Sequence, residues 1–277
     1  MLRLLCLALI AAAASAADVL DDAKEKFAAG DFQGALAAAD EVPADDAAYV
    51  KARYLAGEIR LMLGDPAEAE KAFRAALGKK PGAEPLLTGL GRALLERDQA
   101  AEALRVLEEA VKAAPDSARA LCFLGIARMR TTEGRKGRKE IEKAAGLAKD
   151  DPEIARAAVV AYLKDEDTDD AGKAARRFAK AQPKSPMGPF LVAVVQEREK
   201  GYDDAIASYE AALKLDDSFL DAHKNLAILC IAQNPLYTNT LRTEKAQKHF
   251  ERYFELGGRD EHVREIWNTL QQFLKSR

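Results

Sequence analysis

A periodicity of about 34 residues constrains this chain more than any other feature of its sequence. It is clearest in segment 201–217, where a turn precedes Ala205, Ile206, Tyr209 and Ala212. Residues three and four apart share one face of a helix, so this spacing predicts an amphipathic helix. Small residues on both sides of Tyr209 would let neighbouring helices approach closely.

The same order of small, large and small residues recurs along the chain. One period separates two such triplets, Ala69, Phe73 and Ala76, and Ala103, Leu107 and Ala110. Counting in steps of about 34 residues predicts repeat starts near residues 16, 50, 84, 118, 152, 186 and 220, with an insertion near 233–242. A single helix pair cannot bury its apolar face alone, so neighbouring units must stack.

This pattern resembles the tetratricopeptide repeat (TPR), in which small residues at positions 8, 20 and 27 set the helix spacing and a proline at position 32 ends the unit. The second unit has Gly57, Ala69, Ala76 and Pro81 at these places. The resemblance implies an all-α, right-handed α-solenoid of about seven helix-turn-helix repeats over residues 18–257. An amphipathic segment over residues 258–277 would be a capping helix; a partner-binding helix is the alternative.

Residues 1–17 differ in composition from the repeats. Arg3 precedes an apolar run, and Ala14, Ser15 and Ala16 match a small-x-small cleavage site. These features predict a secretory signal peptide, and hence a periplasmic or secreted protein, although a retained hydrophobic helix would also fit. The run is shorter than the roughly 20 residues of a membrane-spanning helix, so we expect no transmembrane span after its removal.

The sequence offers little for catalysis. His223, His249 and His262 are the only histidines and lack metal-ligand spacing, and His223 falls at a packing position. Cys122 and Cys230 lie in distant repeats, so they are expected in the core rather than in a disulfide. We therefore expect a protein that is not an enzyme and uses neither cofactor nor metal.

The charge distribution favours a protein partner over nucleic acid. The net charge is -3, and the basic run over residues 128–139 has no interleaved aromatic residues for stacking on bases. We interpret this run as a solvated face or a face for an anionic partner.

In the TPR family, ligands bind the concave side, which is lined by positions 2, 5, 9, 12 and 13 of each first helix. Carried onto this chain, the resemblance implies a peptide-binding groove lined by Lys51, Tyr54, Glu58, Arg92, Arg119, Ile126, Arg130, Arg156, Val160, Phe190, Val194 and Arg198. Over repeats two to six these positions hold more cations than anions. This favours an extended segment with carboxylates and apolar anchors. Each apolar residue could instead pack between helices.

The prediction is thus a non-catalytic, exported adaptor or scaffold that binds a partly acidic peptide segment of a protein partner. Two alternatives remain at this point. The chain could be a structural self-association module, or a regulatory subunit of a separately encoded envelope enzyme or secretion system. The pattern leaves the oligomeric state open.

Overall fold

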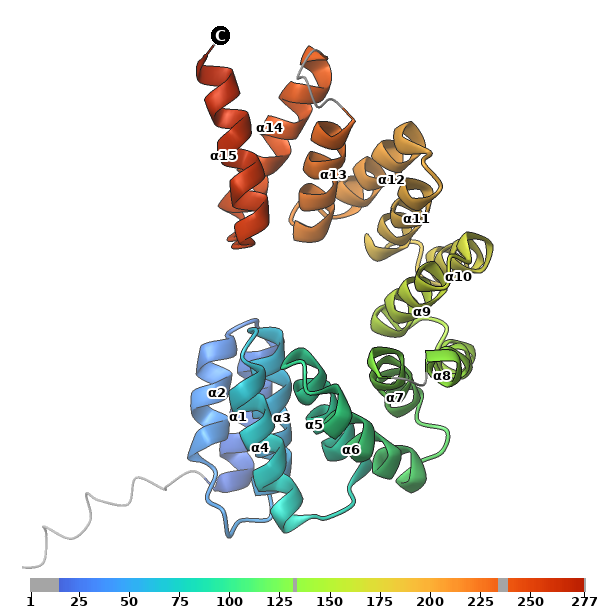
Figure 1. Ribbon diagram of the computed structural model, residues 1–277. Helices are drawn as coiled ribbons and strands as arrows, with labels where there is room; N and C mark the ends of the chain where they lie inside the picture. Colours follow the sequence, from blue (N-terminus) through green and yellow to red (C-terminus); the bar gives the residue numbers. More distant parts are fainter. Residues whose placement is uncertain (1–14, 132–133, 234–238, 277) are drawn as a thin grey trace, which may run out of the picture. The chain divides into compact units, whose positions relative to one another are not determined.

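The structure is a computed structural model that describes residues 15–131, 134–233 and 239–276. Every regular element in these ranges is an α-helix, and the helices follow one another in pairs joined by short connections (Figure 1). Seven pairs precede a final helix, which confirms the predicted all-α solenoid of about seven repeats with a C-terminal helix. The chain divides into two compact units, Met1–Ala144 (unit 1) and Ala145–Arg277 (unit 2).

Unit 1 is built from four helix pairs, the last of which runs across the boundary. They are α1 (Ala16–Ala28) with α2 (Phe32–Glu41), α3 (Tyr49–Met62) with α4 (Pro66–Lys79), α5 (Glu84–Glu96) with α6 (Ala100–Ala113), and α7 (Ala118–Arg130) with α8 (Gly134–Leu147). Helices α2, α4 and α6 each also pack against the first helix of the next pair. Because α5 contacts both α3 and α7 as well, these three helices share one face, which we call the first-helix face.

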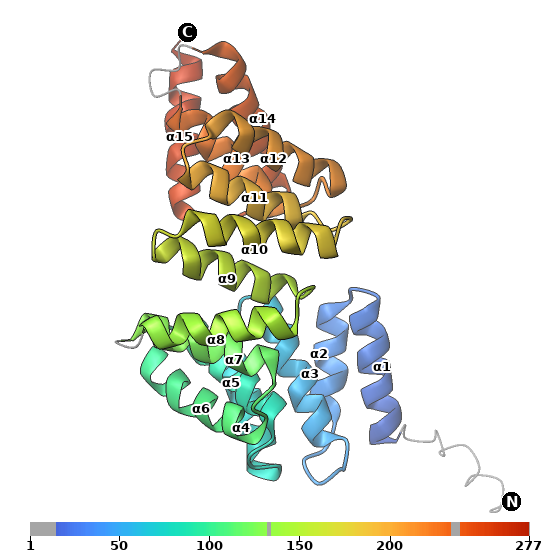
Figure 2. The same ribbon diagram turned by 90° about the vertical axis from the view of Figure 1, so that its right-hand side faces the viewer.

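Unit 2 contains three helix pairs and the final helix. They are α9 (Pro152–Lys164) with α10 (Thr168–Ala181), α11 (Met187–Arg198) with α12 (Tyr202–Leu215), α13 (Leu220–Ala232) with α14 (Thr240–Glu255), and the single helix α15 (Glu261–Lys275). Figure 2 shows α9 and α10 side by side, in agreement with their contacts. Helix α15 packs on α13 and α14 and places Trp267 5.7 Å from the ring of Phe250, so its apolar face covers the last pair.

Helix spacing in unit 1 depends on glycines that face large rings. Phe73 of α4 is fully buried and lies between Gly57 of α3 and Gly89 of α5. A Cβ atom added at either glycine would come within 2.5 Å of the Phe73 ring, far closer than van der Waals contact. Close packing of this kind leaves no room for a methyl group, so both glycines are required by the ring.

The turn inside several pairs requires a left-handed backbone. Gly30 and Gly64 have φ values of +80° and +76°, which glycine adopts without strain. Asp98, Glu166 and Lys200 hold the equivalent place with φ values of 59°, 61° and 64°. The two helices that each turn joins therefore impose this backbone geometry, even where the turn residue is not glycine.

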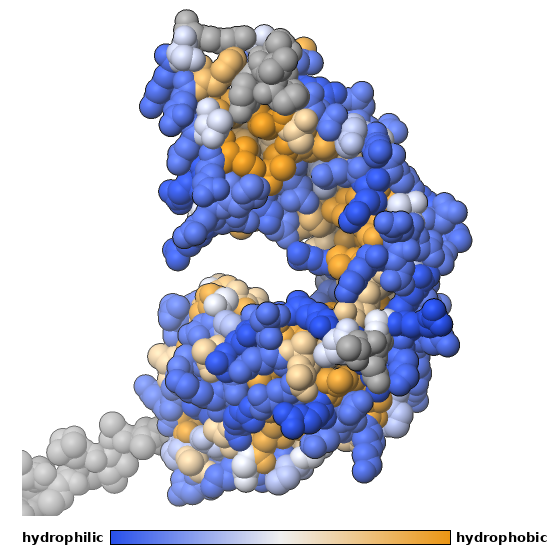
Figure 3. Space-filling model, in the orientation of Figure 1, coloured by the Kyte–Doolittle hydropathy of each residue, from blue (hydrophilic) through white to orange (hydrophobic). Residues whose placement is uncertain are grey.

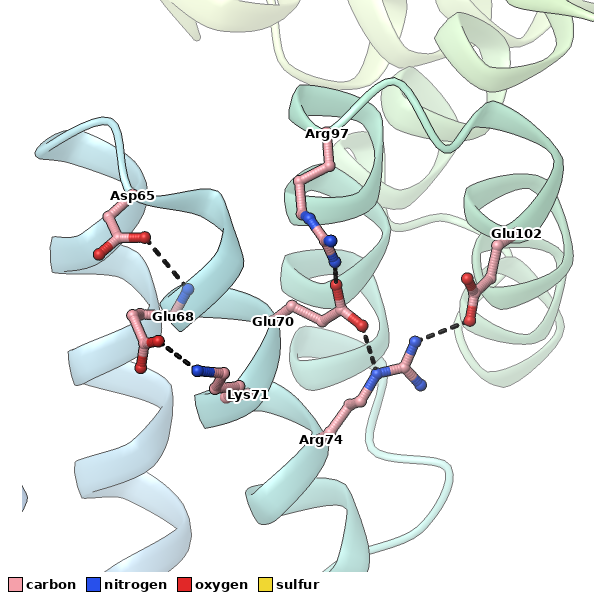
Figure 4. Close-up of polar contacts among 7 residues, drawn as sticks. All are labelled: Asp65, Glu68, Glu70, Lys71, Arg74, Arg97 and Glu102. Atoms are coloured by element: carbon pink, nitrogen blue, oxygen red, sulfur yellow. Dashed lines mark hydrogen bonds and ion pairs between the residues drawn. The ribbon is translucent and has the colours of Figure 1, made fainter.

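An ion-pair ladder crosses the pairs on the side of α4, α5 and α6 (Figure 4). Glu70, whose side chain is only 13% exposed, accepts hydrogen bonds from Arg97 and, at 2.7 Å, from Arg74. Arg74 reaches on to Glu102 at 2.7 Å. Burial opposes the charge of Glu70, but the two arginine hydrogen bonds outweigh it and hold the pKa of this carboxyl below its usual value.

Replacing Glu70 with glutamine is expected to lower the free energy of unfolding of unit 1 by about 1–2 kcal/mol, because two arginines lose their shared carboxylate. Urea denaturation followed by circular dichroism measures this change. Glu68→Gln is the matched control on the same helix: Glu68 pairs with Lys71 in the solvent, and its loss should cost less than about 0.5 kcal/mol. Equal effects of the two substitutions would contradict the structural role of the ladder.

The N-terminal prediction falls mostly outside the described residues, which begin at Ser15. Ser15 is the N-cap of α1: its hydroxyl accepts from the Asp18 backbone N–H, and the Asp18 carboxylate accepts from the Ser15 backbone N–H. The expected cleavage motif therefore overlaps the first turn of α1. Within the described ranges, no helix has the length and apolar character needed to cross a membrane. Half of the predicted insertion, residues 234–238, also lies outside these ranges.

Candidate functional site

The first-helix face of unit 1 is hollowed where α3, α5 and α7 meet. The hollow has a volume of about 310 Å³ and is lined by Tyr54, Glu58, Glu84, Pro85, Thr88, Gly89, Arg92, Ser117, Ala118, Arg119 and Phe123. We call Tyr54, Gly89 and Phe123 its floor; the Phe73 ring lies directly against Gly89 but is itself buried outside the lining. The Tyr54 ring lies 6.1 Å from the Phe73 ring, and together with Phe123 it makes this floor largely aromatic.

Two arginines stand at the rim of the hollow. The guanidinium of Arg92 lies 6.0 Å above the Phe123 ring, a cation–π distance, and also pairs with Glu96 at 3.1 Å and Glu58 at 3.9 Å. Arg119 is exposed at the start of α7. Burial, helped by the Glu58 charge, raises the pKa of Tyr54, and Arg119 opposes this rise, so the phenol stays protonated at neutral pH.

Glu84 also lines the hollow and is fixed there by two hydroxyl groups. Its Oε1 accepts hydrogen bonds from Thr88 at 2.8 Å and from Ser117 at 2.7 Å. Ser117 is also the N-cap of α7 and accepts from the Ala120 N–H. The rim thus presents both signs of charge around an apolar floor, which suits a ligand with one apolar group and neighbouring polar groups.

Unit 2 has a hollow of its own beside α11. It measures about 450 Å³ and is lined by Leu163, Val194, Glu197, Arg198, Lys200, Tyr202, Tyr209 and Asn225. At its base the Tyr209 hydroxyl donates to Glu197 at 2.9 Å and accepts from Asn225 at 3.3 Å. Burial and the Glu197 charge raise the pKa of Tyr209, so this phenol is a permanent hydrogen-bond donor. In Figure 3, hydrophobic atoms reach the mostly hydrophilic surface of each unit in small patches.

The structure brings six of the twelve predicted groove residues into the two hollows. Four line the hollow of unit 1, and two line that of unit 2: Tyr54, Glu58, Arg92, Arg119, Val194 and Arg198. Lys51 and Val160 are exposed elsewhere on first helices, with Val160 55% exposed. Ile126 is half-buried against the core.

Two predicted arginines are held by internal partners. Arg130 donates to the backbone carbonyl of Leu95 at 2.6 Å and so binds the last turn of α5. Arg156 of α9 pairs with Asp221 of α13 at 3.5 Å. Their first contacts are therefore with this chain, and a ligand carboxylate would have to compete for them.

Phe190, another predicted groove residue, is buried. It is only 4% exposed, with its ring 5.7 Å from Tyr209 and 5.1 Å from Phe219. The neighbouring Gly188 lets α11 approach α10 so closely that a Cβ atom there would lie 3.0 Å from the Cβ of Ala179. Phe190 consequently packs between helices, the alternative that the pattern had left open for apolar residues.

Repeat positions outside the family's ligand-binding set supply several lining residues that the sequence did not indicate. Glu84 and Ser117 sit at the joint between pairs, and Phe123 and Asn225 occupy position 6 of their first helices. The serine before α7 and the glutamate at the start of α5 are 33 residues apart, close to one period, and this spacing is a signal that could have paired them.

His223 is buried, at 2% exposed, which agrees with its predicted packing role. Its Nδ1 lies 2.9 Å from Nδ1 of His249, and its Nε2 lies 2.9 Å from the Asp217 carbonyl oxygen. A carbonyl can only accept, so Nε2 of His223 carries the hydrogen and Nδ1 of His249 donates to His223. In the described part of the chain, no three His, Cys, Asp or Glu side chains are grouped so that they could hold a metal ion.

Comparison with known proteins identifies the repeats. Two tetratricopeptide repeat family models match the chain, one over residues 20–84 and one over residues 60–122. Residues 20–122 therefore contain tetratricopeptide repeats, as the spacing of small residues predicted. No curated protein matches the chain.

Solved structures extend this similarity to the fold of nearly the whole chain. A tetratricopeptide repeat protein from Parabacteroides merdae superposes with a TM-score of 0.68 at 13% identity, covering 92% of this chain and 98% of that one. The Cut9–Hcn1 hetero-tetramer of the APC/C superposes with a TM-score of 0.61 at 14% identity, covering 92% of this chain and 56% of that one. A monomeric mutant of IFIT1 with m7Gppp-AAAA superposes with a TM-score of 0.64 at 17% identity, covering 94% of this chain and 65% of that one. At these identities the likeness concerns the fold.

Proposed function

We propose that this protein is a non-catalytic scaffold whose first-helix face binds an extended, partly acidic segment of a protein partner. The observation that carries the proposal is the hollow of unit 1, where Arg92 and Arg119 stand over an aromatic floor. A stack of helix pairs that offers a hollowed face with fixed polar groups is suited to binding rather than to chemistry.

The internal ion pairs of the rim do not prevent acidic ligands from binding. Arg92 meets Glu58 at 3.9 Å and Glu96 at 3.1 Å, and these side chains are 21% and 36% exposed. Ion pairs with access to solvent contribute only about 0–1 kcal/mol, so a ligand carboxylate can replace them at small cost. Glu84 is already satisfied by two hydroxyl groups, which reduces its repulsion toward an approaching carboxylate.

Reversing the charge of Arg119 is expected to weaken partner binding about tenfold or more, because the attraction to a ligand carboxylate becomes repulsion. The measurement is affinity capture with the purified chain, identification of the captured protein, and titration of its acidic segment against the native and Arg119→Glu proteins at two salt concentrations. The native affinity should fall with salt, and the affinity of the variant should not.

Arg105→Glu is the matched control. Arg105 is exposed on α6, a second helix of the same unit, and the substitution changes the net charge equally. If Arg119→Glu and Arg105→Glu reduce binding alike, the effect is one of overall charge and the site assignment is wrong. A single-stranded RNA tested in the same titration distinguishes the partner class, since tighter binding of RNA would replace the protein ligand.

A self-association role is the second candidate. The exposed Met62 and Leu63 at the end of α3 and Leu215 at the end of α12, between 44% and 55% exposed, could meet another copy. Light scattering of the chain over a range of concentrations tests this. A monomer at the highest concentration removes this candidate, whereas a regulatory role beside a separate enzyme would remain compatible with a monomer.

We further propose that residues 1–17 direct export to the periplasm or the outside of the cell. The supporting observations are the apolar run and the small-x-small motif at Ala14, Ser15 and Ala16. N-terminal sequencing of the protein recovered from cell fractions tests both points. An uncleaved N-terminus in the cytosolic fraction would contradict the proposal.

A further inference from the structure

The hollow of unit 1 has the size of a pocket for one side chain. Its volume of about 310 Å³ is at the lower end of the roughly 300–1,000 Å³ typical of ligand pockets. Gly89 contributes no side chain to the floor, and the Phe73 ring behind it is fully buried. The other floor residues, Tyr54 and Phe123, present aromatic carbon, and a polar group placed against it would lose its hydrogen bonds to water.

The walls continue this apolar surface. Phe123 is only 6% exposed and lies beneath the Arg92 guanidinium, and Tyr54 keeps its ring on Phe73. Pro85 lines the same hollow and has no backbone N–H to present. A bulky aliphatic or aromatic side chain would find contacts on all these sides, each of which adds to its burial.

The charged groups stand above this floor. Arg92 and Arg119 flank the hollow from α5 and α7, while the Glu84 carboxylate is held by hydroxyl groups of Thr88 and Ser117. A segment whose anchor fills the hollow has to pass over the rim on both sides, so the residues next to the anchor lie near the charged groups there. The arginines there complement acidic neighbours.

We propose that this hollow is an anchor pocket that takes one phenylalanine or leucine side chain of the partner, with an acidic residue directly beside it in the partner's sequence. The anchor occupies the floor formed by Gly89, Tyr54 and Phe123, and the acidic residue pairs with Arg92 or Arg119. This assignment rests on the proposed peptide-binding function and adds the chemistry of the segment that binds.

The test uses three blocked tripeptides, N-acetyl-Asp-Phe-Asp amide, Asp-Ala-Asp amide and Asn-Phe-Asn amide, titrated into the isotope-labelled full chain. Chemical shift changes at the Gly89 and Phe123 amides report the pocket directly. We expect saturable shifts with Asp-Phe-Asp, about tenfold weaker binding of Asp-Ala-Asp because the anchor's apolar area is lost, and about two- to fivefold weaker binding of Asn-Phe-Asn.

A protein variant supplies the second arm. Ala118 lines the hollow at the start of α7, so Ala118→Trp should fill it and abolish the shifts. Ala101→Trp, at an exposed position near the start of α6, should leave binding within twofold of the native value. If Ala118→Trp lost its helical circular dichroism, the peptide series on the native chain would still decide the question.

The possible results distinguish the anchor pocket from the wider proposal of a groove for a partly acidic segment. Equal affinity for Asp-Phe-Asp and Asp-Ala-Asp overturns the anchor pocket while leaving an acidic-segment groove intact. Shifts that appear only in unit 2, or no shifts with any tripeptide at millimolar concentration, also overturn it. If the Arg119→Glu titration fails but Asp-Phe-Asp binds at Gly89, the pocket stands and the longer acidic segment does not.

Discussion

Replacing Phe73 with alanine is expected to lower the free energy of unfolding of unit 1 by about 3–5 kcal/mol. The ring is fully buried, fills the space between α3 and α5, and belongs to a cluster of buried residues drawn from α3 to α7. Its removal leaves a cavity bordered by two glycines, which have no side chains to fill it. Urea denaturation followed by circular dichroism measures the loss.

Met62→Ala is the control for this prediction. Met62 is a large apolar residue of the adjoining helix α3, but it is 55% exposed, so its truncation should change stability by less than about 0.5 kcal/mol. Trp267 lies in unit 2, and its fluorescence gives a separate reading of that unit in the same samples. If Phe73→Ala lowered the free energy of unfolding by less than about 1 kcal/mol, the ring would not be essential to the packing of α3 and α5.

Unit 2 is expected to lose about 2 kcal/mol of stability between about pH 7.5 and about pH 5 through His249. Burial and the neighbouring His223 lower the pKa of His249 from 6.5 to about 4, assisted by Lys248 and Lys245 of α14 and opposed by Glu210 of α12. Below pH 6.5 the unfolded chain binds a proton that the folded chain excludes, so stability falls as the pH falls toward 4.

Three variants test this pH dependence. His249→Asn keeps an N–H donor toward His223 but cannot titrate, so the dependence should flatten. His262→Asn is the control, because His262 is 77% exposed on α15 and its loss should leave the dependence unchanged. The third, Asp217→Asn, removes a carboxylate 4.0 Å from His223 Nε2 but keeps the backbone carbonyl that this nitrogen contacts. Trp267 fluorescence in urea at each pH supplies the free energies, and an unaltered slope in His249→Asn would refute the assignment.

The helical architecture was predictable because the same packing requirement, small residues around a large one, recurs in successive repeats. Ala69, Phe73 and Ala76 satisfy it in one pair, and Ala103, Leu107 and Ala110 satisfy it in the next, so a mismatch in one unit does not hide the period. In the structure these six residues are buried at less than 1% exposure. Local spacing was sufficient here, since helices pack mainly against the helices of their own pair and of the adjacent pairs.

The candidate site was predictable only in part, because the exposure of a first-helix residue depends on the side chains of the next pair. Tyr54 and Phe190 share position 5 of their repeats, yet Tyr54 lines a hollow and Phe190 is buried beneath Phe219. The difference lies in the side chains nearby: the large ring of Phe219 covers Phe190, whereas Tyr54 is not covered in this way. Of the two hydroxyl groups that fix Glu84, Thr88 lies on the same helix, but Ser117 precedes another helix, and a pattern read along one helix does not contain this second contact.

The contact of Phe73 with Gly57 and Gly89 has a consequence for protein engineering. Repeat arrays invite module exchange, in which one helix pair is deleted, duplicated or replaced. Here the ring of one pair fits only if the following pair begins with glycine at the matching place, whereas the pairs that start with α7 and α13 carry Phe123 and Asn225 there. The pair of α3 and α4 therefore has to be followed by a pair with glycine at this place, and a shuffled or consensus version would need Phe73 and Gly89 to be moved together.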